Sequence, residues 1–378
     1  MPARARGPGA ARADEGTRTA RALALAVLLA AGCRDAPAPR IGLVMGGDAQ
    51  SVSRLVLEDW HASADPAHRG LSLVDFNRRY TSDAAVALAT AESLAAMPAV
   101  VAVVGHSNSS ASIIASQVYN ARHLVQVAPT STSPLYREAG PWSFRLVGGD
   151  DRQAEFLADE VVKRLPARVA VMHVNDDYGR ALRQLLFASL KARGVAVAYD
   201  GSYVEGEPFD AGEATAAIAH ARPTLLVWLG RSPQFGRLVD SLRAALPTLP
   251  ILASDGFGSP TLVRDPRHRF DGIRYVRLVD VAHGSPALQS LRARYRQLTG
   301  TELTDQAALS YDALMLLAQA TREAGADRAA IRSWLTALGK SHPAFPGVTG
   351  PIAFNEHGER VTGYTLVTVG DTLRAGTR

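Results

Sequence analysis

Short apolar runs alternate with longer amphipathic stretches along most of the chain. The runs at residues 100–104, 169–174 and 224–229 consist almost entirely of Val, Leu and other apolar residues. Continuous runs of this kind are typical of strands that are covered on both faces. The stretches between them, such as residues 84–96, have the spacing of amphipathic helices. Strands that alternate with helices predict parallel sheets built from βαβ units, and therefore an α/β fold.

The same pattern predicts the elements one by one. We expect strands at residues 40–45, 71–76, 100–104, 124–128, 169–174, 224–229 and 251–253, and helices at 53–63, at 84–96 and from about 110 onward. Near the C-terminus, residues 350–355 and 363–369 are β-rich and flank the turn Glu356-His357-Gly358. This arrangement predicts a terminal β-hairpin.

The N-terminus has the features of an export signal. Arginines precede an apolar run at residues 22–31, which is too short to span a bilayer because that takes about 20 apolar residues. We therefore expect residues 1–32 to be a signal peptide. Small residues stand directly before Cys33, the only cysteine, and Arg34 and Asp35 follow it. These polar neighbours favour lipidation of Cys33 over a buried thiol, with residues 33–39 as a tether and the protein anchored at the periplasmic or cell-surface side of a membrane.

Composition and motifs exclude several function classes. The apolar fraction of 47% is that of an ordinary globular protein, and five arginines of the predicted leader contribute much of the formal net charge of +5. Without a basic stripe that contains aromatics, nucleic-acid binding is not expected. No phosphate loop, dinucleotide fingerprint, H-E-x-x-H pattern or Cys/His cluster occurs in the sequence, so we expect no cofactor, no metal and no enzyme.

One segment resembles a catalytic motif. Ser107 lies in Gly-His-Ser-Asn-Ser between a predicted strand and a predicted helix, but the fifth residue of a hydrolase elbow is glycine and here it is Ser109. A hydrolase that uses Ser107 or Ser109 is therefore the less favoured alternative.

Hydroxyl, acidic and aromatic side chains follow several predicted strands. Ser109 and Ser110 stand where a helix N-cap is expected, and the loop 129–134 is rich in Thr and Ser. Tyr178 and Asp255 each come after a strand. In open α/β sheets, ligands bind outside the carboxyl ends of the strands. These residues therefore predict a cleft that suits a zwitterion, although the serines could simply cap their own helix.

Four stretches resemble the leucine/isoleucine/valine-binding proteins, which have the type I solute-binding fold of bacterial ABC importers. They are Val-Val-Gly-His at 103–106 with the serines after it, Ala-Pro-Thr-Ser-Thr-Ser-Pro at 128–134, Ser-Tyr-Asp-Ala at 310–313, and Gly-Pro-Ile-Ala-Phe-Asn at 350–355 with Gly358. The resemblance implies two lobes, each a mainly parallel sheet flanked by helices, joined by three hinge crossings. It places lobe 1 at residues 40–146 and 279–348, lobe 2 at 147–278 and 349–378, and the crossings near 144–148, 275–279 and 347–351.

The resemblance also implies roles for individual residues. Ser109 and Thr132 would bind the carboxylate of an amino acid. The Ser131 carbonyl, the Thr132 hydroxyl and Asp255 would hold its ammonium group, with Asp255 standing where the family usually has glutamate. Tyr178 would close on the ligand from the second lobe.

Four further residues are candidate ligand contacts. Ser107 and Asn108 lie in the serine-rich segment. Arg231 would pair with a second acid on the ligand or else be a solvated surface residue, and Tyr311 would either bind the ligand or pack. The segment 46–51 lacks the Thr-Gly-Pro loop of the family, so we expect no aromatic stacking there.

The function implied by the resemblance is capture of an amino acid or an analogue in the cleft between the lobes. Closure about the hinges would bury the solute, and the closed form would be recognised by an ABC permease and its ATPase subunits. A receptor domain that senses amides or amino acids for a partner protein is the alternative.

Overall fold

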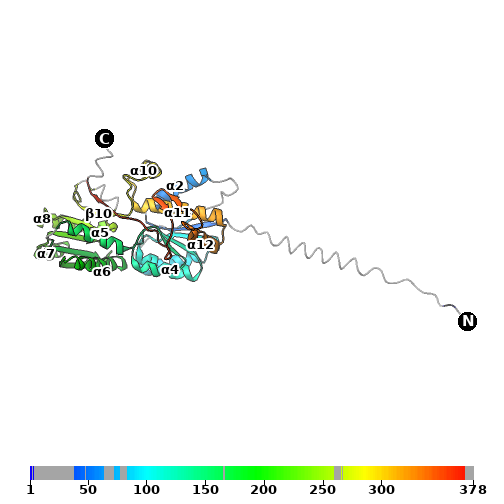
Figure 1. Ribbon diagram of the computed structural model, residues 1–378, viewed down its shortest axis with the longest axis horizontal. Helices are drawn as coiled ribbons and strands as arrows, with labels where there is room; N and C mark the ends of the chain where they lie inside the picture. The colour runs from blue at the N-terminus through cyan, green and yellow to red at the C-terminus, as the bar shows by residue number, and fades with distance from the viewer. Residues whose placement is uncertain are drawn as a thin grey trace. The chain divides into compact units, whose positions relative to one another are not determined.

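The structure is a computed structural model that describes residues 1, 3, 38–46, 48–63, 72–76, 83–164, 167–258, 265 and 267–370. The predicted signal peptide, with Cys33 after it, lies outside the described residues except for Met1 and Ala3. The segment from Pro39 onward carries the fold, shown in Figure 1.

The first lobe is a parallel five-stranded sheet in the order β2-β1-β3-β4-β5. Its strands are β1 (Arg40–Val44), β2 (Ser72–Asp75), β3 (Val100–Gly105), β4 (Val125–Ala128) and β5 (Ser143–Arg145). The helices of this lobe are α2 (Asp48–Ser63), α3 (Ala84–Ala95), α4 (Ser109–Ala121), α10 (Pro286–Thr299), α11 (Asp305–Ala324) and α12 (Arg328–Ala337). Helices pack on both faces of β3: Val103 packs with α3 and α4, while Ala102 and Val104 belong to the core that includes α2 and α11.

The second lobe is a six-stranded sheet in the order β13-β10-β9-β8-β6-β7. Its pairs are parallel except for β10 with the edge strand β13, which is antiparallel. The strands are β6 (Val169–Val174), β7 (Val197–Tyr203), β8 (Leu225–Leu229), β9 (Ile251–Ala253), β10 (Arg274–Arg277) and β13 (Thr365–Thr368), and the helices are α5 (Asp150–Val162), α6 (Asp177–Ala192), α7 (Ala211–His220) and α8 (Ser232–Ala245). The predicted α/β fold with two mainly parallel sheets is confirmed.

The predicted terminal hairpin is wrong. Strand β12 (Gly350–Ile352) pairs with β11 (Phe345–Gly347), whereas β13 pairs with β10 of the second lobe. The reason is burial: Ile352 and Phe354 lie in the core of the first lobe, so this segment cannot reach β13.

The chain crosses between the lobes three times. The first crossing lies between β5 and α5 and the second between β10 and α10, and both overlap the predicted segments. The third comes later than predicted. Residues 347–351 belong to the β11–β12 hairpin, and the crossing falls between Phe354 and β13, where Tyr364 packs against the cores of both lobes.

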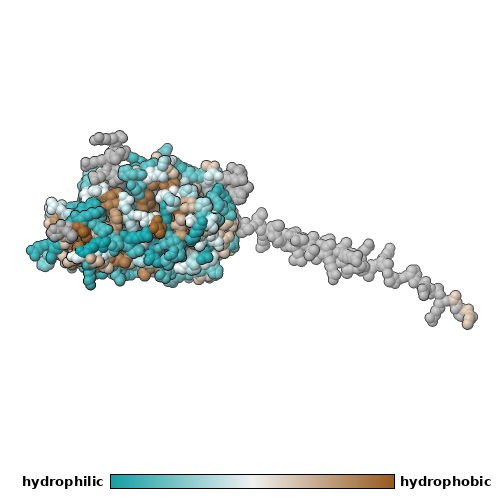
Figure 2. Space-filling model, viewed as in Figure 1, coloured by the Kyte–Doolittle hydropathy of each residue, from teal (hydrophilic) through white to brown (hydrophobic). Residues whose placement is uncertain are grey.

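The surface visible in Figure 2 is mainly hydrophilic, with small separate apolar areas. Within the described ranges, none of the helices has the length and apolar character needed to cross a membrane.

Candidate functional site

A cavity of about 300 Å³ lies between the lobes, at the carboxyl ends of the strands. The first lobe contributes the β3–α4 turn and Thr130, and the second contributes the start of α6 and the turn after β9. The cavity continues along the second crossing, past Leu278 and Val281, to the start of α11. Six of the residues singled out from the sequence line it: Ser107, Asn108, Ser109, Tyr178, Arg231 and Asp255.

Helix α4 begins at the cavity, but the predicted N-cap is wrong by one residue. Asn108 is the cap: its backbone is extended (φ −135°, ψ 160°) and its Oδ1 accepts a hydrogen bond from Ala111 N at 2.9 Å. Ser109 and Ser110 are the first helical residues. The alternative interpretation assumed that the two serine hydroxyls cap their own helix, and they do not.

Asn108 lies in the cavity wall, and its side-chain amide has a donor without a partner among the described residues. Asn108 is buried, with 6% of its surface exposed, and among the described residues its Nδ2 has no hydrogen-bond partner. A buried amide N–H without a partner costs free energy, so an acceptor placed in the cavity would be favoured. Asn108 and the first turn of α4 are together a candidate site for an anionic group, because backbone N–H groups and the helix dipole favour negative charge at a helix N-terminus.

Three serines of this region are held by backbone donors. Ser107 Oγ accepts from Gly46 N at 2.8 Å, and Ser109 Oγ accepts from Ser133 N at 3.2 Å. Ser110 Oγ accepts from Asp177 N at 3.3 Å, which joins the N-termini of α4 and α6 across the lobes. Since a hydroxyl both accepts and donates, Ser109 can still donate a hydrogen bond.

Beyond Thr130, the loop that follows β4 lies behind the cavity wall. Ser131 and Thr132 are fully buried and neither is part of the wall, which Thr130 forms instead. The Ser131 carbonyl, expected to accept from the ammonium group, accepts from Arg145 Nη1 at 3.1 Å. The Thr132 carbonyl accepts from Asp150 N at 2.9 Å.

Two carboxyl groups lie on the second-lobe side of the site. Asp255 Oδ1 accepts from Tyr178 Oη at 2.6 Å and from Gln153 Nε2 at 2.9 Å, and the same Nε2 donates to Asp150 Oδ1 at 2.9 Å. Burial raises the pKa of Asp255, and burial together with the charge of Asp255 raises the pKa of Asp150 well above its ordinary value. A cation in the cavity would therefore stabilise the ionised forms of both groups.

The three arginines of the cavity wall each have an acidic partner. Arg231 pairs with Asp176 at 3.0 Å and Glu205 at 2.9 Å, and its guanidinium lies 5.8 Å from the centre of the Tyr178 ring. Arg277 Nε donates to Asp305 at 2.8 Å, and Arg292 Nε pairs with Glu302 at 3.0 Å. Arg231 is thus neither a solvated surface residue nor a cation lacking a counterion.

Tyr311 lies away from the cavity. Its hydroxyl donates to Asp59 Oδ2 at 2.7 Å, which links α11 to α2 in the first lobe. Of the two predicted alternatives, binding and packing, the contacts are those of packing.

Metal and general-base chemistry find no support in the part of the chain that the structure describes. No group of three or more His, Cys, Asp or Glu there could hold a metal ion. His106, beside Ser107, contacts Tyr119 Oη through Nε2 at 3.2 Å, and burial lowers its pKa to about 4.

Sequence reasoning missed Arg145, Asp150 and Gln153. They lie at the first crossing and in the first turn of α5, where polar residues are ordinary, so nothing in the local pattern marks them. The one available signal was the resemblance itself, since any residue at a hinge crossing lies near the cleft.

Comparisons with known proteins identify relatives of the chain. The family profile described as "Receptor family ligand binding region" matches residues 72–372. The chain is 32% identical over 266 residues to an amino acid binding protein of Pseudomonas aeruginosa, and this match covers 68% of each of the two chains. It is 27% identical over 268 residues to the Leu/Ile/Val-binding protein homolog 1 of Brucella abortus, covering 70% of each.

Solved structures show the same fold. The branched-chain amino acid transporter substrate binding protein LivJ of Streptococcus pneumoniae, in complex with isoleucine, is 21% identical with a TM-score of 0.78, and the match covers 88% of this chain and 97% of that one. A solute binding protein of an ABC transporter from Rhodopseudomonas palustris, in complex with 3,4-dihydroxy benzoic acid, is 15% identical with a TM-score of 0.76, covering 87% and 92%. The fold by itself therefore does not specify the ligand.

Proposed function

The chain belongs to the type I periplasmic binding proteins, the receptor family ligand binding region, and from this membership we propose that it captures an amino acid or a close analogue outside the cytoplasm for an ABC importer. The observation that carries the proposal is the cavity between the lobes, with amide and hydroxyl donors on one side and a buried carboxyl group on the other. A zwitterion has the charges that match both sides.

The ligand carboxylate would bind the first lobe. Ser109 and the N-terminus of α4 supply donors, and Asn108 Nδ2 is a further one. The hydroxyl of Thr132, which lies directly behind Thr130, would be another donor to the carboxylate. Ser107, whose hydroxyl accepts from Gly46 N, would lie at the rim of the carboxylate site.

The ligand ammonium would bind Asp255, with the Ser131 carbonyl shared between the ligand and Arg145. Tyr178 would cover the ligand while its hydroxyl orients the Asp255 carboxylate. Arg231, already paired with Asp176 and Glu205, would shape the wall by stacking on Tyr178.

Lobe closure would bury the solute, and the bond from Asp177 N to Ser110 Oγ is one contact that the closed form would use. Permease and ATPase subunits would then recognise the closed form. Within this proposal lobe 1 comprises residues 40–146 and 279–354, because Ile352 and Phe354 pack in its core, and lobe 2 comprises residues 147–278 and 355–378.

Export and anchoring form a separate part of the proposal. Residues 1–32 would be removed and Cys33 lipidated, which leaves the protein tethered through residues 33–39. Expression of the full chain with Cys33→Ser in a bacterial host should move the protein from the membrane fraction to the soluble periplasmic fraction. If the distribution between fractions is the same for both proteins, the anchor is not Cys33.

Binding without catalysis is the role we assign to the serines. A serine nucleophile needs a base within hydrogen-bond reach, and within the described residues no histidine bonds to Ser107 or Ser109. Ester or amide turnover that is lost in Ser107→Ala would contradict this part of the proposal.

Thermal unfolding of the purified full chain against the twenty L-amino acids tests the proposed function. A ligand present at about 100 times its Kd adds ~2.7 kcal/mol to the free energy of unfolding, which raises Tm by about 4 °C in a chain of this length. A shift with a group of related amino acids supports solute capture. No shift with any of them, for protein purified free of bound ligand, would contradict amino-acid capture and favour the sensor alternative with another solute.

A further inference from the structure

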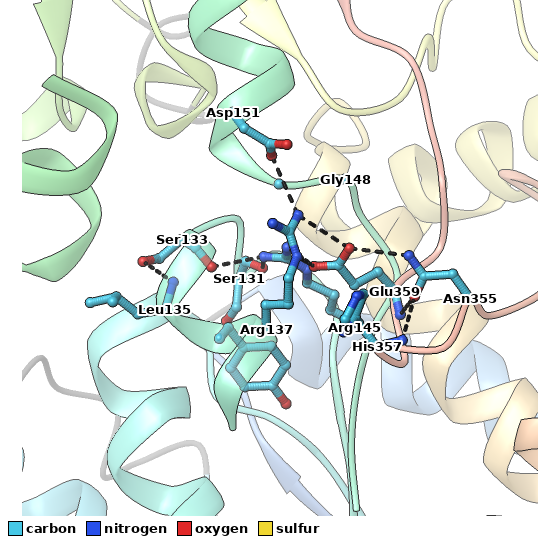
Figure 3. A network of polar contacts seen from close by, with 12 residues as sticks. Ser131, Ser133, Leu135, Arg137, Arg145, Gly148, Asp151, Asn355, His357 and Glu359 are labelled. Atoms are coloured by element: carbon cyan, nitrogen blue, oxygen red, sulfur yellow. Dashed lines mark hydrogen bonds and ion pairs between the residues drawn. The ribbon is translucent and has the colours of Figure 1, made fainter. Parts of the chain in front are cut away.

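Arg145 is a buried arginine at the centre of a polar network on the first crossing. It is the last residue of β5, and none of its surface is exposed. Figure 3 shows its side chain between the loop with Ser131 and Ser133 on one side and Glu359 on the other. Burying a guanidinium in a protein is costly unless it is paired and hydrogen-bonded, so its contacts indicate what it does.

The guanidinium holds the loop on both sides of Thr132. Arg145 Nη1 donates to the Ser131 carbonyl at 3.1 Å and to the Ser133 carbonyl at 2.9 Å. The carbonyl between them, that of Thr132, accepts from Asp150 N at 2.9 Å. Three consecutive carbonyls of residues 129–134, here called the ligand loop, therefore accept hydrogen bonds from one short segment, the first crossing.

Glu359, which lies in the third crossing, neutralises the charge of Arg145. It forms an ion pair with Arg145 Nη2, and it also accepts from Arg137 Nε at 3.1 Å and from Asn355 Nδ2 at 3.2 Å. Backbone bonds join the same two segments, since Arg145 N donates to Gly358 O at 2.9 Å and Arg360 N donates to Arg145 O at 3.0 Å. Burial would raise the pKa of Glu359, but Arg145 and the other donors outweigh it and lower that pKa, so the pair is ionised.

We propose that Arg145 is a positioning residue for the ligand loop: it fixes the backbone on both sides of Thr132 and ties the loop to two hinge crossings through Glu359. The expected effect on ligand affinity rests on the proposed function, whereas the positioning of the loop by Arg145 does not. A loop held in this way keeps the Thr132 hydroxyl in one place when the lobes move.

Arg137 provides a matched control for substitution. It bonds to the same Glu359 and lies 3.7 Å from Asp151, but its side chain is 30% exposed and none of its described bonds reaches the loop carbonyls. Arg145→Lys and Arg137→Lys make the same chemical change, because lysine keeps the charge and loses the planar fork that bonds to several acceptors at once.

The first experiment is hydrogen exchange of the ligand-free full chain. Peptides that cover residues 131–136 should exchange about tenfold faster or more in Arg145→Lys than in the wild type, because two anchors of the loop are lost, and should be unchanged in Arg137→Lys. Equal exchange in the wild type and Arg145→Lys, or equal acceleration in both variants, would overturn the proposal. This result is independent of any ligand.

The second experiment is calorimetric titration with L-leucine. Affinity should fall about tenfold in Arg145→Lys and less than about twofold in Arg137→Lys. If the wild type does not bind L-leucine, the choice of probe or the proposed function has failed, and the exchange experiment alone decides the role of Arg145. If Arg145→Lys does not fold, the double variant Arg145→Met/Glu359→Met removes both charges together, which proteins often tolerate. Its loop peptides must then exchange as fast as expected for Arg145→Lys, and slow exchange there would refute the proposal.

Discussion

Replacement of Asp255 by asparagine separates a binding role from a structural one. The isosteric amide keeps an acceptor for Tyr178 Oη, now at 2.6 Å, and for Gln153 Nε2, at 2.9 Å, so the local packing should survive. The negative charge is lost. A hydrogen bond to a charged group is worth about 1.5–3 kcal/mol, so the affinity for an ammonium-bearing ligand should fall roughly 10- to 150-fold.

The unliganded protein should respond in the opposite direction. Burial raises the pKa of Asp255, which means that its ionised form is destabilised in the folded state. The amide removes that cost and also the repulsion with Asp150, so Tm of the unliganded protein should stay the same or increase. A lower affinity without a lower Tm is the expected signature of a binding residue.

Isothermal calorimetry with the strongest amino-acid ligand, together with thermal unfolding, measures both quantities. Asp159→Asn is the control, because Asp159 also lies on the second lobe, pairs with Arg193 at 2.7 Å and is 61% exposed, away from the cavity. An affinity for D255N within about twofold of the wild type would show that Asp255 does not bind the ammonium. A large loss of Tm in D255N would instead indicate a structural role.

Three further predictions concern Asp255, Tyr311 and Gly358. Because the folded-state pKa of Asp255 is raised, the unliganded folded protein binds more protons than the unfolded chain at pH values between the ordinary pKa and the raised one. The stability of the unliganded protein should therefore fall as pH rises through that window, whereas ligand affinity should rise. Tm and Kd measured from about pH 4 to about pH 8 will check both. Tyr311→Phe loses the 2.7 Å bond to Asp59 and should cost about 0.5–1.5 kcal/mol of unfolding free energy in urea without changing ligand affinity; a weaker affinity would return Tyr311 to the site. Gly358→Ala should destabilise by about 1–3 kcal/mol, since φ is +72° and the added Cβ would lie 2.5 Å from Ser143 O; an unchanged urea midpoint would contradict this.

The strands could be predicted because their signal is local. Residues 100–104 form an unbroken apolar run, and β3 is buried along its whole length between two layers of helices. The C-terminal pairing could not be predicted in this way. The turn around Glu356 does form, with Asn355 N donating to Glu359 O at 3.0 Å, but Ile352 is buried in one lobe while Thr365 pairs in the other.

Those residues of the candidate site that directly follow a strand could be predicted from the sequence. Ser109, Tyr178 and Asp255 each come shortly after a strand, and the parallel topology brings them to one cavity. Arg145 escaped notice because the residue that neutralises it, Glu359, is 214 positions further along the chain. No local pattern indicates that an arginine at the end of a short strand is fully buried.

The ion pairs of the cavity wall set a condition on the ligand side chain. Arg231, Arg277 and Arg292 already have carboxylate partners, so an acidic side chain entering the cavity would have to compete with Asp176, Asp305 or Glu302 for a guanidinium. Breaking such a pair leaves a carboxylate without its counterion in a partly dehydrated place, which is unfavourable. Discrimination against aspartate and glutamate would thus come from competition inside the wall and would need no steric barrier.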